Sequence, residues 1–206
     1  MSVEDARKFF NVDESDHVIL LMPGSRRQEI KLLLPEMLNA AEILSVQKPA
    51  RFFLPVADNV DESEILRQVD AAKVNVTLTK QFRYDLMNIA DAAIATSGTV
   101  VLEAALLNLP CVVLYKMARL NYFIGKLFVD IENFSLPNIL AGKKIQTELL
   151  QDEVTAERIV EEISKLYRGE LHREKVVVDL KSACAQLGES GAVERVAQKI
   201  LEIADK

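Results

Sequence analysis

The chain has 206 residues, of which 50% are hydrophobic, and this is enough material for one sizeable core. Its formal net charge of -6 argues against general binding to nucleic acid, because phosphate backbones attract basic surfaces. The sequence has no run of about 18 apolar residues, the length that predicts a membrane-spanning helix, and its acidic start has no signal-peptide pattern. Cys111 and Cys184 are expected to be reduced thiols of a cytoplasmic protein, and no metal site is expected, because the histidines have no Cys or His at ligand spacing.

Apolar runs typical of buried strands alternate with amphipathic segments typical of helices from His17 to Tyr115. We expect strands at 17–22, 51–56, 74–79, 92–95 and 111–115, and helices at about 30–46, 59–73, 81–90 and 100–108. Pro55 lies inside the second strand, which should therefore stop early or lie near an edge of the sheet. This alternation with short turns predicts an α/β fold with a doubly wound parallel sheet, and ligands bind such sheets outside the carboxyl ends of the strands.

Two turns of small residues follow predicted strands, and both favour anion binding. Gly24–Arg26 connects the first strand to its helix, and Ser97–Thr99 makes the corresponding turn after the fourth strand. The first amide groups of a helix have no intrahelical partner, and a glycine lets an anion approach them closely. Arg26 adds a guanidinium that suits phosphate oxygens. The two turns together predict a diphosphate site that needs no metal ion.

Glu103 lies one helical turn beyond Thr99, on the same face of the predicted helix. Its carboxylate would accept hydrogen bonds from sugar hydroxyls while a diphosphate occupies the turn. The alternative is an ordinary core helix with a serine N-cap, and this stretch alone does not decide between the two. The patterns G-x-x-x-x-G-K-[ST] and G-x-G-x-x-G are absent, which disfavours P-loop ATP hydrolysis and dinucleotide binding of the usual type.

The sequence changes character after Tyr115. Residues 116–128 are basic and apolar, a combination that favours either a membrane interface or packing against a second domain. The loop at 135–142 carries Asn138, which would serve either as a turn residue or as a ligand for sugar hydroxyls. A short helical piece is expected at 148–152, followed by helices at 155–168, 170–187 and 190–205.

Four motifs together make the sequence recognisable. They are Met22–Arg26 followed by Glu29, Ala95–Thr99 followed by Leu102 and Glu103, Leu109–Tyr115, and Ser135–Gly142 followed by Glu148–Gln151. In this order they resemble the lipid-A-disaccharide synthases, and the match runs from about Val18 to the end of the chain. The Ser-Gly-Thr…Glu element is also similar to nucleotide-sugar transferases of the GT-B type in general.

The resemblance implies an inverting glycosyltransferase with two Rossmann-like domains that face each other across a cleft. Members of the family transfer 2,3-diacylglucosamine from its UDP donor to 2,3-diacylglucosamine 1-phosphate and release UDP, with no metal or other cofactor. This chain resembles only the C-terminal, donor-nucleotide half. The acceptor site and the general base are therefore expected on an absent N-terminal domain, and the isolated chain is expected to be inactive.

The resemblance also gives the domain organisation and the site residues. We expect a lead-in segment at 1–15, a Rossmann-like UDP-sugar-binding domain at 16–150, and C-terminal helices at 151–206 that pack on it or are exchanged with a second copy. The donor phosphates and ribose are expected to contact Gly24, Ser25, Arg26, Ser97, Gly98, Thr99 and Glu103. Arg26 and Asn138 are the expected catalytic residues, because they would hold the donor and neutralise the departing UDP. Glu148 and Gln151 are further candidates near the same loop.

The expected partners are the UDP-sugar, the lipid acceptor, the absent domain, a second copy of the chain and the inner-membrane surface. Residues 116–128 would lie at that surface, and the protein would be cytoplasmic and peripheral to the membrane. Two alternatives remain open. One is half of another UDP-sugar GT-B enzyme, of the peptidoglycan transferase or 2-epimerase type. The other is a non-catalytic interaction domain whose apolar stretch and helical tail join partners.

Overall fold

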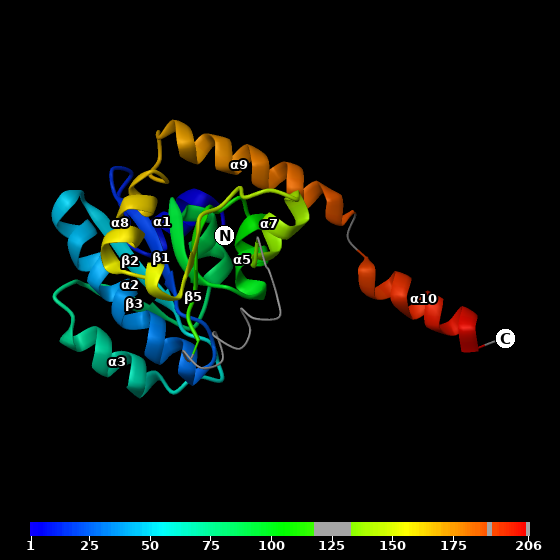
Figure 1. The fold of residues 1–206 in the computed structure, drawn as a ribbon, viewed down its shortest axis with the longest axis horizontal. Coiled ribbons are helices and arrows are strands. Elements are labelled where there is room, and N and C mark those ends of the chain that lie inside the picture. The colour runs from blue at the N-terminus through cyan, green and yellow to red at the C-terminus, as the bar shows by residue number, and fades with distance from the viewer. Residues whose placement is uncertain (118–132, 189–190, 205–206) are drawn as a thin grey trace.

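The computed structural model describes residues 1–117, 133–188 and 191–204 (Figure 1). Its centre is a sheet of six strands in the order β3-β2-β1-β4-β5-β6. The strands are β1 (His17–Met22), β2 (Ala50–Pro55), β3 (Val76–Thr79), β4 (Ala92–Thr96), β5 (Cys111–Tyr115) and β6 (Glu148–Leu150). Every neighbouring pair is parallel, which confirms the predicted doubly wound α/β fold.

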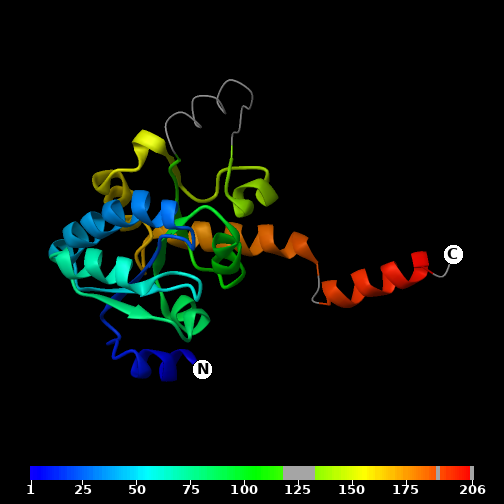
Figure 2. The same ribbon diagram turned by 90° about the horizontal axis from the view of Figure 1, so that it is seen from below.

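Helices cover both faces of the sheet (Figures 1 and 2). They are α1 (Val3–Phe9), α2 (Arg27–Gln47), α3 (Glu62–Ala71), α4 (Arg83–Ile89), α5 (Thr99–Leu106), α7 (Leu136–Ala141), α8 (Ala156–Ser164), α9 (Leu171–Cys184) and α10 (Ala192–Ala204). In β1, Ile19 and Leu21 pack with residues of α2, α3 and α8, whereas Val18 and Leu20 pack with residues of α1, α4 and α5. Because successive side chains of a strand point to opposite faces, an unbroken apolar run serves two cores.

The strand order reverses between β1 and β4. The chain runs outward from β1 through β2 to β3 and then returns to place β4 on the other side of β1, where Ile19–Met22 pair with Ala92–Ala95. The turns Gly24–Arg26 and Ser97–Thr99 follow these two adjacent strands, so both emerge at the carboxyl edge of the sheet. This reversal is the place where open α/β sheets bind ligands.

One expectation about an individual element is wrong. Glu148–Leu150 is a strand paired with β5, and only Gln151–Glu153 is helical, as a short 3-10 turn, where the pattern predicts helix over 148–152. Three residues are too few to reveal a period. β2 ends at Pro55, one residue before the expected end of the strand, in agreement with the expectation that Pro55 makes the strand stop early or lie near an edge; only β3 separates β2 from the edge of the sheet.

The C-terminal helices differ in how they pack. α8 and α9 bury Ile159, Ile163 and Leu180 in the core, whereas α10 buries no residue and extends away from the body in both views (Figures 1 and 2). The apolar face of α10, predicted to be a packing surface, is exposed. Of the basic apolar stretch 116–128, only Lys116 and Met117 lie within the described residues. None of the described helices is long and apolar enough to cross a bilayer.

Candidate functional site

A cleft of about 830 Å³ opens at the carboxyl edge of the sheet, where the strand order reverses. Its walls come from the segments that follow β1, β2, β3 and β4, so four separate parts of the chain meet there. The cleft is lined by all seven predicted nucleotide-binding residues, namely Gly24, Ser25, Arg26, Ser97, Gly98, Thr99 and Glu103. The structure thus brings the two small-residue turns together around one space.

The first turn depends on a glycine. Gly24 has φ +99°, and a Cβ at this position would collide with the carboxylate of Glu29 and lie 2.8 Å from the Thr96 methyl carbon. Arg26 follows at the N-cap of α2, and its side chain is 80% exposed. Its Nη1 lies 2.6 Å from Glu29 Oε1, and this hydrogen bond raises the pKa of Arg26. The guanidinium therefore lies at the cleft, paired with Glu29 and largely open to solvent.

The second turn presents open backbone to the cleft. Gly98 is the N-cap of α5, its backbone is extended, and a Cβ there would meet no atom within 4 Å. No side chain caps α5, because the Ser97 hydroxyl donates instead to the carbonyl oxygen of Phe134 at 3.2 Å. The alternative of a serine N-cap is therefore wrong. The first amides of α5 face a site that an anion can approach closely.

Glu103 lies one turn into α5, on the cleft wall. Its Oε2 is 3.1 Å from Nη2 of Arg83, at the start of α4, but no hydrogen bond to this shielded oxygen forms within the described residues. The pair is close enough for Coulomb attraction yet is not aligned for donation. The pKa of Arg83 is raised, chiefly by its hydrogen bond to the Tyr84 hydroxyl and also by the charge of Glu103.

Sequence reasoning missed the opposite wall of the cleft, which the segments after β2 and β3 form. This wall contains Asp58, Asn59, Lys80, Arg83 and Tyr84. Each follows the carboxyl end of a strand, and the order of the strands in the sheet brings these residues to the cleft. The wall thus adds Lys80 and Arg83 to the cations of the cleft, and Asp58 to its carboxylates, so the case for an anionic ligand depends on the two turns and Arg26.

The structure does not bring Asn138 to the cleft. Its side chain is fully buried, and its Oδ1 accepts from the amides of Ile145 and Gln146, both at 2.9 Å. Its Nδ2 donates to the Gln146 carbonyl at 2.9 Å and to Glu148 Oε1 at 2.8 Å. All four bonds are internal, so the amide has no free donor for a ligand.

Glu148 joins this buried network to the second turn. Its carboxylate accepts from the amides of Phe134 and Ser135, and the Phe134 carbonyl in turn accepts from the Ser97 hydroxyl. The other candidate, Gln151, accepts from the amide of Met117 at 3.2 Å, while its buried Nε2 has no hydrogen-bond partner among the described residues. These residues support the rim of the site instead of lining the cleft.

Neither cysteine is suited to act as a nucleophile. Burial raises the pKa of Cys111 to about 12 and also raises that of Cys184. Within residues 1–117, 133–188 and 191–204, no group of three His, Cys, Asp or Glu side chains is arranged to hold a metal ion.

Comparisons with known proteins identify relatives along the whole chain. Residues 2–203 match the model of the family described as lipid-A-disaccharide synthetase. The lipid-A-disaccharide synthase of Geobacter metallireducens is 38% identical over 207 aligned residues, which cover 100% of this chain and 54% of that protein. The Myxococcus xanthus protein of the same name is 36% identical and is covered to 52%. The chain thus spans about half the length of the curated relatives it matches.

Solved structures show the same fold in glycosyltransferases. WaaG, a glycosyltransferase involved in lipopolysaccharide biosynthesis, superposes with a TM-score of 0.62 at 16% identity, over 98% of this chain and 50% of that one. The spinosyn rhamnosyltransferase SpnG gives a TM-score of 0.64 at 14% identity, over 92% of this chain and 47% of the other. At these identities the likeness establishes the GT-B half-fold only.

Proposed function

This chain belongs to the lipid-A-disaccharide synthetase family, and on that premise we propose that it is the donor-binding half of an inverting glycosyltransferase of lipid A biosynthesis. The donor is the UDP derivative of 2,3-diacylglucosamine, the acceptor is 2,3-diacylglucosamine 1-phosphate, and UDP leaves. The observation that carries this proposal is the meeting of Gly24–Arg26 and Ser97–Thr99 in one cleft at the reversal of strand order. Two helix N-termini and a guanidinium there suit a diphosphate without a metal ion.

The diphosphate and the ribose each have a matching part of the cleft. The diphosphate lies against the first amides of α5 and α2, with Arg26 at its side. The ribose hydroxyls donate to the carboxylate of Glu103, one helical turn deeper along α5. Charge that develops on the departing UDP is stabilised by groups already in place, which is the main contribution this half makes to catalysis. The acceptor hydroxyl is deprotonated by a base outside these 206 residues.

Asn138 acts in this scheme by positioning and not by contact with the donor. Its side chain organises the Glu148 carboxylate, which holds Phe134 where its carbonyl fixes the Ser97 hydroxyl. Replacing Asn138 by Ala removes four buried hydrogen bonds and should loosen the second turn. We expect weaker UDP binding together with lower stability, in contrast to a ligand residue, whose loss affects binding alone.

A UDP titration followed by NMR tests the proposal. We expect UDP and pyrophosphate to shift the backbone amides of Gly24–Arg26, Ser97–Thr99 and Glu103, and uridine to shift Glu103 without the turns. Arg26→Met should weaken UDP binding about tenfold, as the loss of one charge-assisted bond predicts. Arg27→Met, at the neighbouring residue outside the cleft lining, is the matched control. Shifts confined to other surfaces, or none at all, would defeat the assignment.

The specific donor is tested by comparing acylated with non-acylated UDP-glucosamine. Acylation that improves binding in the cleft supports the lipid A assignment. Equal binding, or preference for the unacylated sugar, supports the alternative of another UDP-sugar enzyme of the same fold. Transfer itself requires the other half of the protein, so the isolated chain is expected to bind and not to turn over.

The proposal extends to location and assembly. We propose a cytoplasmic protein that works at the inner-membrane surface, since its substrates carry acyl chains; co-sedimentation with anionic vesicles tests this. We also propose that a second copy covers the exposed apolar face of α10, formed by Val193, Val196 and Ile200. Light scattering should report a dimer, and Ile200→Glu should return it to a monomer with its UDP affinity unchanged. A monomer at all concentrations would refute the assembly alone.

A further inference from the structure

Arg83 and Glu103 form a contact across the cleft that joins two distant parts of the sequence. Arg83 begins α4, after β3, whereas Glu103 lies in α5, after β4. Their closest atoms, Nη2 and Oε2, are 3.1 Å apart. Oε2 is shielded from solvent and accepts no hydrogen bond from the described residues, although the Glu103 side chain as a whole is 28% exposed. One carboxylate oxygen is thus turned to the guanidinium of a residue that, like Glu103, lines the cleft.

Arg83 is itself held in place. Its Nη2 donates to the Tyr84 hydroxyl at 2.8 Å, and its guanidinium carbon lies 4.8 Å from the centre of the Tyr84 ring. The preceding residue, Phe82, has a left-handed backbone with φ +60° and packs its ring edge-on against Phe9 at 5.2 Å. A bulky residue adopts this backbone only where the surroundings enforce it. The base of the Arg83 side chain is therefore fixed relative to the cleft.

The negative charge of Glu103 would weaken the binding of a nearby diphosphate, and the positive charge of Arg83 offsets it. A carboxylate beside a diphosphate repels it, and in a partly shielded cleft this repulsion is stronger than in water. A guanidinium at 3.1 Å from Oε2 offsets the charge of the carboxylate and leaves its other oxygen, Oε1, to accept hydrogen bonds from a ligand. Glu103 can then accept from two adjacent hydroxyls of a ribose while the phosphates lie nearby.

Resting on the proposed function, we propose that Arg83 is a positioning residue for nucleotide recognition. It holds and neutralises Glu103 so that this carboxylate accepts from the vicinal ribose hydroxyls, and the site thereby distinguishes ribonucleotides from 2′-deoxyribonucleotides. Arg83 does not bind the phosphates. The Arg83–Glu103 pair acts as one unit, so the two side chains should show strong coupling in their effects on ribose recognition.

Calorimetric titration of the chain with UDP and with 2′-deoxy-UDP tests this. We expect the wild-type protein to prefer UDP by about tenfold, which is about 1.4 kcal/mol. Arg83→Met should reduce this ratio to about one with little loss of 2′-deoxy-UDP affinity, and Glu103→Gln should do the same. The double variant should lose no more than either single variant. Arg83→Lys keeps the charge and should restore part of the ratio.

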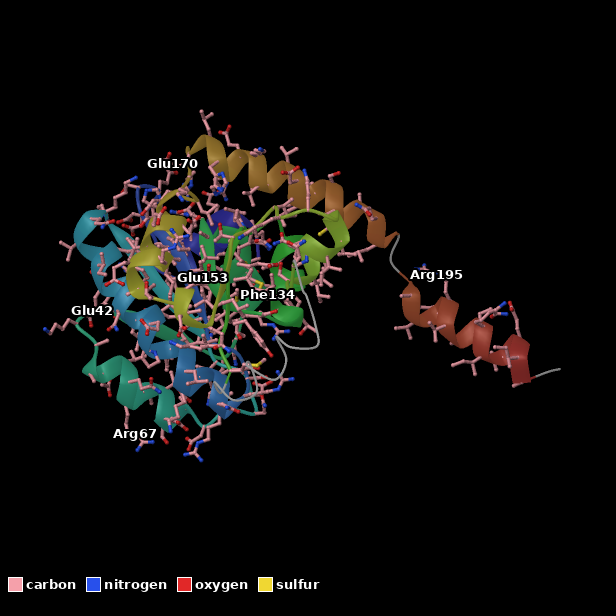
Figure 3. All side chains as sticks on the ribbon, in the orientation of Figure 1. Glu42, Arg67, Phe134, Glu153, Glu170 and Arg195 are labelled. Atoms are coloured by element: carbon pink, nitrogen blue, oxygen red, sulfur yellow. The ribbon has the colours of Figure 1, made fainter. Side chains whose placement is uncertain are left out.

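Arg67→Met is the matched control. Arg67 projects outward from α3, away from the cleft lining, and its loss changes the net charge equally (Figure 3). It should leave the ratio intact. If Arg83→Met weakens UDP, 2′-deoxy-UDP and pyrophosphate alike, Arg83 is a phosphate ligand and the inference is wrong. The inference is also wrong if Arg83→Met keeps a preference of about tenfold for UDP over 2′-deoxy-UDP, or if this variant binds UDP more tightly than the wild-type protein. Absence of UDP binding to the wild-type protein would instead overturn the proposed function, and this inference with it.

Discussion

Gly98→Ala separates the anion site from the stability of the fold. The backbone at Gly98 is extended, so alanine adopts it without strain, and the new Cβ meets no protein atom within 4 Å. A change of glycine to alanine at such a position stabilises a protein by about 0.4–1 kcal/mol, because the unfolded chain loses freedom. The methyl group projects into space that the proposed diphosphate occupies beside the N-terminus of α5.

The cost to binding follows from what the methyl group displaces. An anion held back from the first amides of α5 loses about one charge-assisted hydrogen bond, about 1.5 kcal/mol, and about 0.5 kcal/mol of helix-dipole attraction. The sum of about 2 kcal/mol predicts that UDP binds about 30-fold more weakly. Binding of uridine, which has no phosphate, should be unchanged. The same substitution should therefore raise the melting temperature slightly and lower the affinity for UDP.

Gly24→Ala is the informative contrast. Here φ is +99°, and a Cβ would collide with the Glu29 carboxylate and press on Thr96, so the change should destabilise the fold by about 1–3 kcal/mol. Thermal unfolding and UDP titration of both variants give the test. If Gly98→Ala binds UDP and pyrophosphate as tightly as the wild-type chain, no phosphate approaches the amides of α5, and the reasoning behind the diphosphate site fails.

Three further predictions concern stability and reactivity. Asp91 is buried and accepts a hydrogen bond from Arg168 Nε at 2.9 Å. Asp91→Asn should therefore lower the free energy of unfolding by about 2–3 kcal/mol, which is less than for a fully buried pair because Arg168 is half-exposed. An unchanged urea midpoint would contradict this. The buried Thr96 hydroxyl has no hydrogen-bond partner among the described residues, so Thr96→Val should raise the unfolding free energy by about 1 kcal/mol in the same assay. The pKa of Cys111 is raised to about 12, so this thiol should hold almost no thiolate at pH 8 and should resist iodoacetamide until the chain unfolds. Cys184 is less buried and should be alkylated first. Mass spectrometry of the native protein checks this order, and alkylation of Cys111 before Cys184 would contradict it.

The central strands could be predicted closely because both of their faces are buried. The runs at β1, β4 and β5 are apolar without interruption, and their observed bounds agree with the predicted ones to within one residue. β6 could not be predicted, since a carboxylate opens a strand of three residues. What makes Glu148 acceptable there is a set of amide donors from Phe134 and Ser135, contacts that exist only after folding.

The candidate site was predictable on one wall and not on the other. The two turns carry a local signal, because small residues after an apolar run are visible in the sequence. Lys80, Arg83 and Asp58 have no such signal: each is an ordinary charged residue in a loop, and only the order of the strands brings it to the cleft. Local sequence patterns therefore predict the two turns whose backbone amides can meet an anion. The charged side chains of the other wall reach the cleft only through the order of the strands in the sheet.

Asn138 belongs to a motif of the family, yet its side chain bonds only within the protein, where contact with the donor was expected. The loop that carries it has to place Phe134 beside Ser97, and a buried loop must satisfy its own backbone groups. A single amide side chain does this at once, because its oxygen accepts from two successive N–H groups and its nitrogen donates twice. Aspartate would lose the two donations and bring a second carboxylate next to Glu148, and alanine would leave the amides of Ile145 and Gln146 without their acceptor. The asparagine at this position thus satisfies the loop from within, and through Glu148 and Phe134 the loop supports the second turn.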